Sequence, residues 1–160
     1  MANNADNKIK NPIHDLRSAL EFLKNQPGEL VSTNVEVDPC AELSGVYRYV
    51  GAGGTCQRPT RKNGPAMVFN KIKGFDDISV VIGLNGSRKR VGHFLNCAPE
   101  KLGHLLKDPV KNALQPVLVS ADKAVCQQVT HFAEDADFDL RKLLPAPTNT
   151  EKDAGPYITM

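Results

Sequence analysis

An apolar run that ends in a glycine turn and a basic segment constrains the fold more than any other feature of this sequence. Residues 78–84 read ISVVIGL, and nearly every side chain in this run is apolar. A short apolar run bounded by a turn predicts a β-strand that is covered on both faces. Asn85-Gly86 then turns the chain, and Ser87 is a candidate N-cap for a helix that extends to about Asn96. We therefore expect an α+β fold in which residues 78–84 form the central strand of a small mixed sheet.

Helix-start signals and one-sided apolar patterns predict helices that flank this sheet. Asn11 is a candidate N-cap with Pro12 at the first helical position, and Asp38-Pro39 would start a second helix in the same way. The predicted helices are 12–25, 39–50, 87–96 and 99–114, with a short one at 138–143, and the predicted strands or extended segments are 30–37, 66–69, 78–84, 117–119 and 126–132.

The fourth predicted helix, 99–114, contains a proline. Pro109 lies in its interior, where we expect it to kink or break the helix, because proline lacks the backbone N–H that the helix would use. Leu102, Leu105 and Leu106 follow helical spacing, so we expect them to face inward.

Composition bounds the class of protein. The chain has 160 residues, which fits one domain or one domain and a fragment. It contains neither an apolar stretch near the ~20 residues of a membrane span nor a secretory signal, so we expect a cytoplasmic protein with no membrane partner. Lys and Arg number 20 against 18 Asp and Glu, and this balance does not favour a nucleic-acid binder. The four cysteines lack C-x2-C spacing, so we expect free thiols and no bound metal.

The candidate site lies in a locally basic part of the chain. Residues 58–93 hold eight Lys and Arg but only two Asp. Ser87, Arg88 and Arg90 follow the glycine turn at a predicted helix start, where free backbone N–H groups favour an anion. We therefore expect these three residues to form an anion-binding or domain-docking surface. A basic surface that is only solvated is the alternative interpretation.

No catalytic set can be assigned from the residues alone. The glycines at 51–54 follow a predicted helix, whereas dinucleotide-binding glycines follow a strand and open a helix. No G-x-S-x-G motif presents a serine nucleophile. The four histidines are scattered along the chain at His14, His93, His104 and His131. Without further information, the residues indicate an α/β-type domain with a candidate anion site.

An ordered set of short motifs resembles the N-terminal part of the UbiD family of decarboxylases. The motifs are DLRSAL at 15–20, GEL at 28–30, EVDP at 36–39, GPA at 64–66, Phe69, KGF at 73–75, GSRKRV at 86–91, DFDLRKLLP at 137–145 and DAGPY at 153–157. The segment ELSGVYRYVGAGGT at 42–55, with RPT at 58–60, resembles the branch that acts on hydroxylated benzoates, such as protocatechuate and gallate decarboxylases of the AroY type.

The resemblance implies a parent enzyme, a carboxy-lyase that uses prenylated FMN. It also implies manganese and potassium beside the flavin, a flavin prenyltransferase that supplies it, a phenolic acid substrate and a homo-oligomer. In the family, the metal ligands and a Glu-Arg-Glu set follow the stretch that matches residues 155–157. We therefore assign no catalytic, cofactor or metal residue to this chain, expect it to bind no cofactor, and expect it to be inactive alone.

The resemblance also predicts how the chain is divided. We expect a mobile tail at 1–11, an N-terminal domain at 12–144 and a connector at 145–160 that leads into a truncated, cofactor-binding β-barrel domain. The rest of the decarboxylase chain would then be its main partner. The alternative is a module that stands alone and holds an anion or a protein through Arg88, Lys89 and Arg90 without catalysis.

Overall fold

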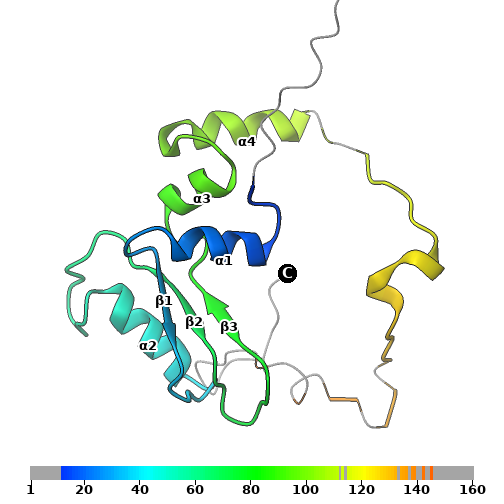
Figure 1. Cartoon of the computed structure of the whole chain (residues 1–160), viewed down its shortest axis with the longest axis horizontal. Coiled ribbons are helices and arrows are strands. Elements are labelled where there is room, and N and C mark those ends of the chain that lie inside the picture. Colours follow the sequence, from blue (N-terminus) through cyan, green and yellow to red (C-terminus); the bar gives the residue numbers. More distant parts are fainter. Residues whose placement is uncertain are drawn as a thin grey trace, which may run out of the picture.

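The computed structural model describes residues 12–111, 113, 115–132, 134–136, 138, 139, 142 and 145. Within them lie helices α1 (Leu16–Lys24), α2 (Glu42–Gly51), α3 (Arg88–Phe94) and α4 (Leu102–Lys111), strands β1 (Leu30–Thr33), β2 (Ala66–Phe69) and β3 (Val80–Ile82), and short 3-10 turns at Pro99–Lys101, Ala121–Lys123 and Val125–Gln127. Figure 1 shows α2 alongside the strands and α3 and α4 beyond one end of the sheet. Helices around a small mixed sheet confirm the α+β prediction.

The sheet has the order β1-β2-β3, with β1 parallel to β2 and β2 antiparallel to β3. Leu30 pairs with Ala66, and Phe69 pairs with Val80. The prediction that 78–84 forms the central strand is therefore wrong, because β2 is central and β3 is a half-buried edge strand. A run of apolar residues indicates burial, but it does not specify which strand has a neighbour on both sides.

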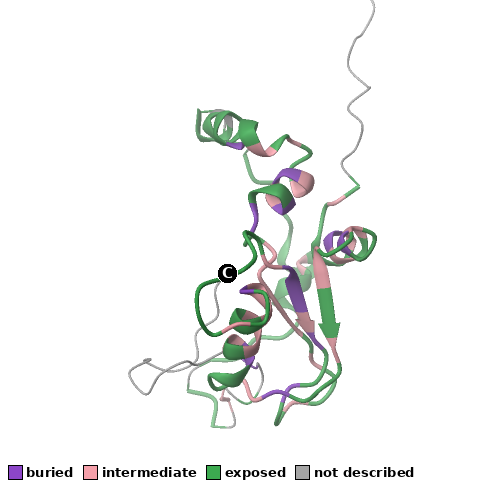
Figure 2. Ribbon diagram, turned by 90° about the vertical axis from the view of Figure 1, so that its left-hand side faces the viewer, coloured by how far each residue is buried: buried purple, intermediate pink, exposed green. Residues whose placement is uncertain are grey.

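The core lies between the sheet and α2. Leu43 from α2 packs with Met67 and Phe69 of β2, and all three are at most 2% exposed. Val46, Tyr47 and Val50 complete the apolar stripe of α2 that the spacing predicts. Figure 2 shows the buried positions concentrated on the strands and on the inner sides of the helices, while α4 is largely exposed.

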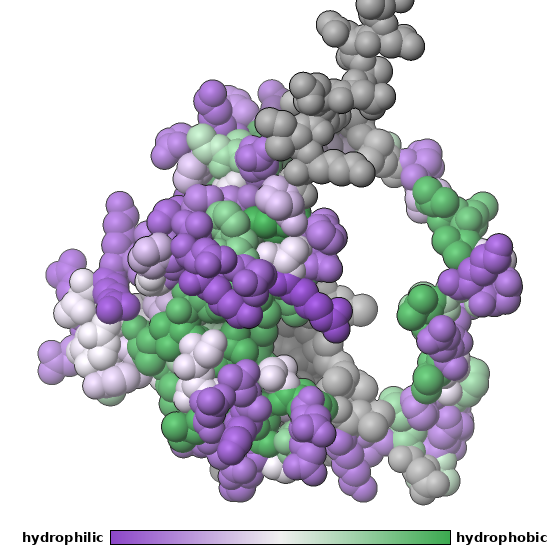
Figure 3. Space-filling view, viewed as in Figure 1, coloured by the Kyte–Doolittle hydropathy of each residue, from purple (hydrophilic) through white to green (hydrophobic). Residues whose placement is uncertain are grey.

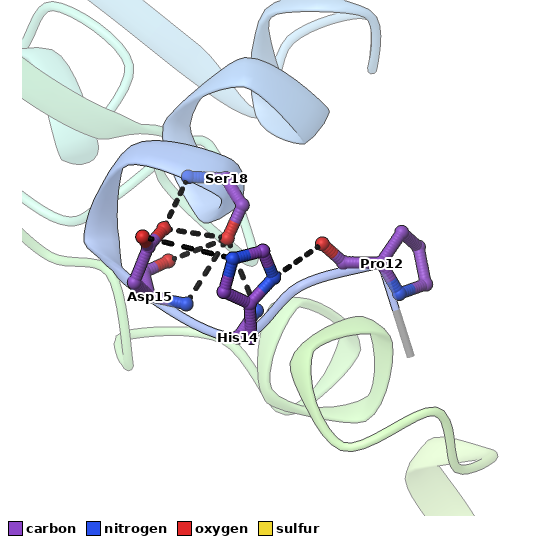
Figure 4. Close-up of polar contacts among 4 residues, drawn as sticks. All are labelled: Pro12, His14, Asp15 and Ser18. Carbon is purple, nitrogen blue, oxygen red and sulfur yellow. Dashed lines mark hydrogen bonds and ion pairs between the residues drawn. The ribbon is translucent and has the colours of Figure 1, made fainter. Parts of the chain in front are cut away.

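Helix α1 begins at Leu16, four residues after Pro12, the predicted first helical residue. The Ser18 amide donates to the Asp15 carboxylate at 2.7 Å, and the Asp15 amide donates back to the Ser18 hydroxyl at 3.0 Å (Figure 4). This reciprocal capping box satisfies two amides that a helix start leaves without partners, so it fixes Asp15 as the N-cap. The prediction of Pro12 as the first helical residue is wrong, and Asn11 lies outside the described residues.

Helix α2 also begins later than predicted. The Asp38 carboxylate accepts from the Cys40 amide at 2.8 Å, and the Glu42 carboxylate accepts from the Asp38 amide at 2.7 Å. These bonds close a turn before the helix, which starts at Glu42 rather than at Pro39. Asp38 also pairs with Lys73 at 2.9 Å, and this hydrogen bond, followed by that from the Cys40 amide, holds the pKa of Asp38 below its ordinary value.

Pro109 lies inside α4, which continues to Lys111, so the helix does not break there, and a kink at this residue stays a prediction. Leu102 is buried, but Leu105 and Leu106 are 38% and 53% exposed, so the inward orientation predicted for those two leucines is wrong.

No helix in the described part of the chain has the length and apolar character that crossing a bilayer requires.

The segment 115–132 departs most from prediction. The prediction of strands at 117–119 and 126–132 is wrong, because the described residues there form a 3-10 turn, bends or no regular element. Val117 and Leu118 are 86% and 99% exposed, and Figure 3 shows apolar atoms along this outlying arc. A strand needs a neighbour for its N–H and C=O groups, and none of the described residues provides one here. Of the helix predicted at 138–143 only part is described, and residues 153–160 lie outside the described set.

Candidate functional site

The predicted site begins at the turn between β3 and α3. Gly83 has φ +78°, and its carbonyl accepts from the Gly86 amide at 3.0 Å. A Cβ at residue 83 would collide with the ring and hydroxyl of Tyr47, so only glycine fits the space and the backbone angle. Ser87 occupies the N-cap position with extended backbone, but its side chain makes no capping hydrogen bond.

Arg90 is the centre of the polar network that follows this turn. Its side chain, although charged, is only 1% exposed. It donates from Nε to the Leu84 carbonyl at 3.2 Å and from the two terminal nitrogens to the carbonyls of Gly83 and Gly64 at 2.9 and 2.8 Å. A terminal nitrogen also donates to the Glu29 carboxylate at 3.0 Å. We call Arg90 with these four partners the Arg90 clamp.

Glu29 provides the negative charge in the Arg90 clamp. It lies directly before β1, its side chain is 13% exposed, and its second oxygen accepts from Lys89 Nζ at 2.9 Å. Burial raises the pKa of Glu29, but the hydrogen bonds from Lys89 and Arg90 outweigh burial and hold that pKa below its ordinary value. The carboxylate therefore stays ionised against two cations and joins β1 to α3.

The three predicted site residues do not lie on one exposed surface. Ser87 is 3% and Arg90 is 1% exposed, whereas Arg88 is exposed and donates to the Pro99 carbonyl at 3.1 Å. An anion-binding or domain-docking role for them stays a prediction, and only Arg88 of the three offers its side chain to a ligand at the surface.

The sequence reasoning missed the role of Glu29. This residue is 61 positions from Arg90, so no local spacing connects the two. A buried arginine requires a nearby acceptor of opposite charge, but which acid supplies it depends on the sheet register.

The described residues do not form a metal centre. No group of three or more His, Cys, Asp or Glu side chains among them could hold a metal ion, so the manganese implied by the family resemblance does not fit here. All four cysteines are free, and Cys97 alone is half-buried. His93 packs its ring on Phe22 at 5.2 Å between centroids, and its buried Nε2 has no hydrogen-bond partner among the described residues.

Comparison with known proteins identifies relatives over nearly the whole chain. Residues 20–108 match the model of the 3-octaprenyl-4-hydroxybenzoate carboxy-lyase N-terminal domain, called UbiD_N, and residues 117–160 match that of the Rift-related domain of the same carboxy-lyase. A gallate decarboxylase from Lactiplantibacillus plantarum is 52% identical over 146 residues.

Solved structures agree with these matches. The apo 3,4-dihydroxybenzoic acid decarboxylase of Enterobacter cloacae is 53% identical with a TM-score of 0.75. An evolved dimeric form of the UbiD-class enzyme HmfF from Pelotomaculum thermopropionicum, in complex with prFMN, is 31% identical with a TM-score of 0.69. Each match covers 91% of this chain but only 30% of the relative, so the chain spans about a third of the length of these proteins. The chain belongs to the UbiD carboxy-lyase family, and its residues 20–108 correspond to the N-terminal domain of that family.

Proposed function

We propose that this chain is the N-terminal part of a non-oxidative decarboxylase of hydroxylated benzoates. The observation that carries the proposal is the 52% identity to a gallate decarboxylase, which extends over 91% of the chain. The 3,4-dihydroxybenzoic acid decarboxylase of Enterobacter cloacae matches at a similar level, whereas HmfF is only 31% identical. The chain is more similar to the gallate and 3,4-dihydroxybenzoic acid decarboxylases than to HmfF, and this difference favours a phenolic acid with adjacent hydroxyl groups as the substrate of the whole protein.

A prenylated flavin belongs to this proposal. HmfF structures in complex with prFMN and with FMN support a flavin for the whole protein, while manganese and potassium rest on the family resemblance alone. Loss of CO2 leaves an electron pair on the ring that no side chain can delocalise, and the flavin supplies the electron sink. We assign the reaction to chain beyond this domain, because the family resemblance places the metal ligands and the Glu-Arg-Glu set after the stretch that matches residues 155–157.

The same proposal gives the domain its partners. The rest of the decarboxylase chain packs against it, a flavin prenyltransferase supplies the cofactor, and the whole protein is a cytoplasmic homo-oligomer. The boundary to the next domain, expected as a β-barrel, is also part of the proposal. Our sequence interpretation places it after residue 144, whereas the match to the Rift-related domain begins at residue 117.

The alternative, an anion-binding module that stands alone, has weaker support from the residues first considered for it. Arg88 donates to a carbonyl, Lys89 pairs with Glu29, and Arg90 is buried. Lys89 and Arg90 thus both pair with Glu29 within the domain, and Arg88 alone of the three keeps exposed donors without a charged partner among the described residues.

A chimeric enzyme tests the proposal. Residues 1–160 would replace the matching N-terminal segment of the Lactiplantibacillus plantarum gallate decarboxylase, and the chimera would be produced together with a flavin prenyltransferase. We expect CO2 release from gallate or from protocatechuate with kcat on the order of 1 per second, within the ordinary range of enzymes. Residues 1–160 alone, given the same cofactors, should release none.

Two results would contradict the proposal. One is a folded chimera that binds flavin but turns over neither acid. The other is decarboxylation by residues 1–160 alone. A matched chimera that carries the N-terminal segment of the 30% identical phenolic acid decarboxylase from Sedimentibacter hydroxybenzoicus separates poor domain docking from lost chemistry.

A further inference from the structure

We propose that the end of α2 and the loop after it, residues 52–65, form a binding site for a phosphate group. Arg48, Arg61 and Lys62 line one cavity of about 280 Å³ there, and Tyr47 and Gly86 complete its wall. We call this space the phosphate cavity. Its volume is near the lower end of small-molecule sites, which span roughly 300–1,000 Å³.

The three cations of the phosphate cavity have no anionic partner. Among the described residues, neither Arg48, Arg61 nor Lys62 makes an ion pair, and no acidic side chain lines the cavity. This distinguishes them from Lys73, Lys89 and Arg90, each of which pairs with a carboxylate. Three like charges around one hollow repel each other, so an anion between them lowers the electrostatic energy.

The 52–65 loop is held against the helix. The Thr60 amide and hydroxyl both donate to the Ala52 carbonyl, at 2.9 and 3.2 Å. A Cβ on Gly64 would lie 2.5 Å from the Cα of Gly51, so the absence of side chains lets the two backbones touch. The Gly64 carbonyl is fixed in turn by the Arg90 clamp. Because both ends of the loop are anchored, little ordering is needed before a ligand binds.

The wall of the phosphate cavity also carries a hydroxyl group, that of Tyr47, beside the three cations. The Tyr47 hydroxyl lies against Gly83 and Gly86, and it has no hydrogen-bond partner among the described residues. The negative end of the α2 dipole points to the same region, but the Ala52 and Gly54 amides already cap the carbonyls of Arg48 and Tyr49. Basic residues often lie at the C-terminal end of a helix because they interact favourably with its dipole. Arg61 and Lys62 are not on the helix and donate to none of its carbonyls, so this effect does not account for their position.

The number of cations selects the class of ligand. A phosphate group carries nearly two negative charges near neutral pH and offers several acceptor oxygens, whereas a carboxylate carries one charge. Two guanidinium groups suit phosphate geometry well. The source is either free phosphate or a phosphate monoester of a small organic molecule. This inference does not depend on decarboxylation by the whole protein.

Amide chemical shifts of the 160-residue chain test the site. Inorganic phosphate, phenyl phosphate and benzoate would each be titrated in low salt up to about 20 mM, which detects millimolar affinity. We expect the two phosphates to shift the amides of Gly51, Gly64 and Gly86. Tighter binding of phenyl phosphate than of inorganic phosphate would identify an organic ester, and equal or weaker binding would identify free phosphate.

Charge-neutral variants complete the test. Arg61→Gln and Lys62→Gln should each weaken binding about threefold, as expected for one exposed charge pair. The matched control is Arg58→Gln, which removes the same charge from the same loop but from outside the phosphate cavity. It should leave the affinity unchanged. An equal loss in Arg58→Gln, benzoate binding as tight as phenyl phosphate, or no shift of these amides would overturn the proposal.

Discussion

Replacement of Arg90 by methionine probes how much the Arg90 clamp contributes to stability. Arg90→Met keeps the apolar stem of the side chain and removes the charge and four hydrogen bonds. Three backbone carbonyls, those of Gly64, Gly83 and Leu84, lose a donor. Glu29 loses its buried partner but keeps Lys89.

The size of the effect follows from burial. Breaking a buried ion pair by removing one partner costs about 3–5 kcal/mol, because the remaining polar groups stay buried without a partner. Arg90 is 1% exposed, which places the Arg90 clamp in this class, while the 13% exposure of Glu29 moves the expected value toward the lower end. We therefore expect a loss of about 3 kcal/mol, a large share of the roughly 5–15 kcal/mol of a typical domain.

Urea unfolding followed by circular dichroism measures this loss. Lys89→Met is the matched control, because it also removes a cation paired with Glu29, but from a side chain that is 55% exposed. Exposed pairs contribute about 0.2–1 kcal/mol, so this variant should unfold near the wild-type midpoint. If Arg90→Met and Lys89→Met lost the same small amount, the reasoning from burial would be refuted.

Three further predictions follow from the structure. The folded-state pKa of Glu29 lies below its ordinary value of 4.5, so its contribution to stability is complete above pH 4.5 and is lost as the pH falls through the lower folded-state value. The Tm of Glu29→Gln should therefore fall less steeply with acid than the Tm of the wild type. Parallel curves of Tm against pH would contradict this. Gly83→Ala should lower the free energy of unfolding by about 1 kcal/mol more than Gly74→Ala does. Both glycines have positive φ, but only a side chain at residue 83 would meet another side chain, that of Tyr47. Equal urea midpoints would contradict this and show that the Tyr47 ring moves aside. Thiol titration of the unfolded chain without reductant should count four free groups, and a count of two would indicate a disulfide.

The local part of the fold could be predicted from the sequence. The apolar stripe of α2 and the strand at 66–69 were found because periodicity and burial are local properties. The beginning of α1 was not predicted correctly. Asp15 and Ser18 hydrogen-bond reciprocally and start the helix there, rather than at the cap-and-proline pair upstream. Both helix-start errors were only a few residues long.

The nonlocal part could not be predicted. Which strand is central, and which acid meets Arg90, depend on how β1 aligns with β2. The basic residues at 88–90 looked like a surface because a charged run is usually solvated, yet the sheet places Arg90 inside. The apolar residues at 117–119 looked like a strand, but a strand forms only where a neighbouring backbone exists.

The Arg90 clamp has a consequence for the order in which the protein is made. Glu29, Gly64, Gly83 and Leu84 all precede Arg90 in the chain, so every acceptor has been synthesised before the guanidinium that joins them. Translation proceeds at about 5–20 residues per second, and domains generally fold as units with the N-terminal one first. The Arg90 clamp can therefore close on the ribosome soon after α3 leaves the exit tunnel, while later parts of the chain are still inside the tunnel or not yet made.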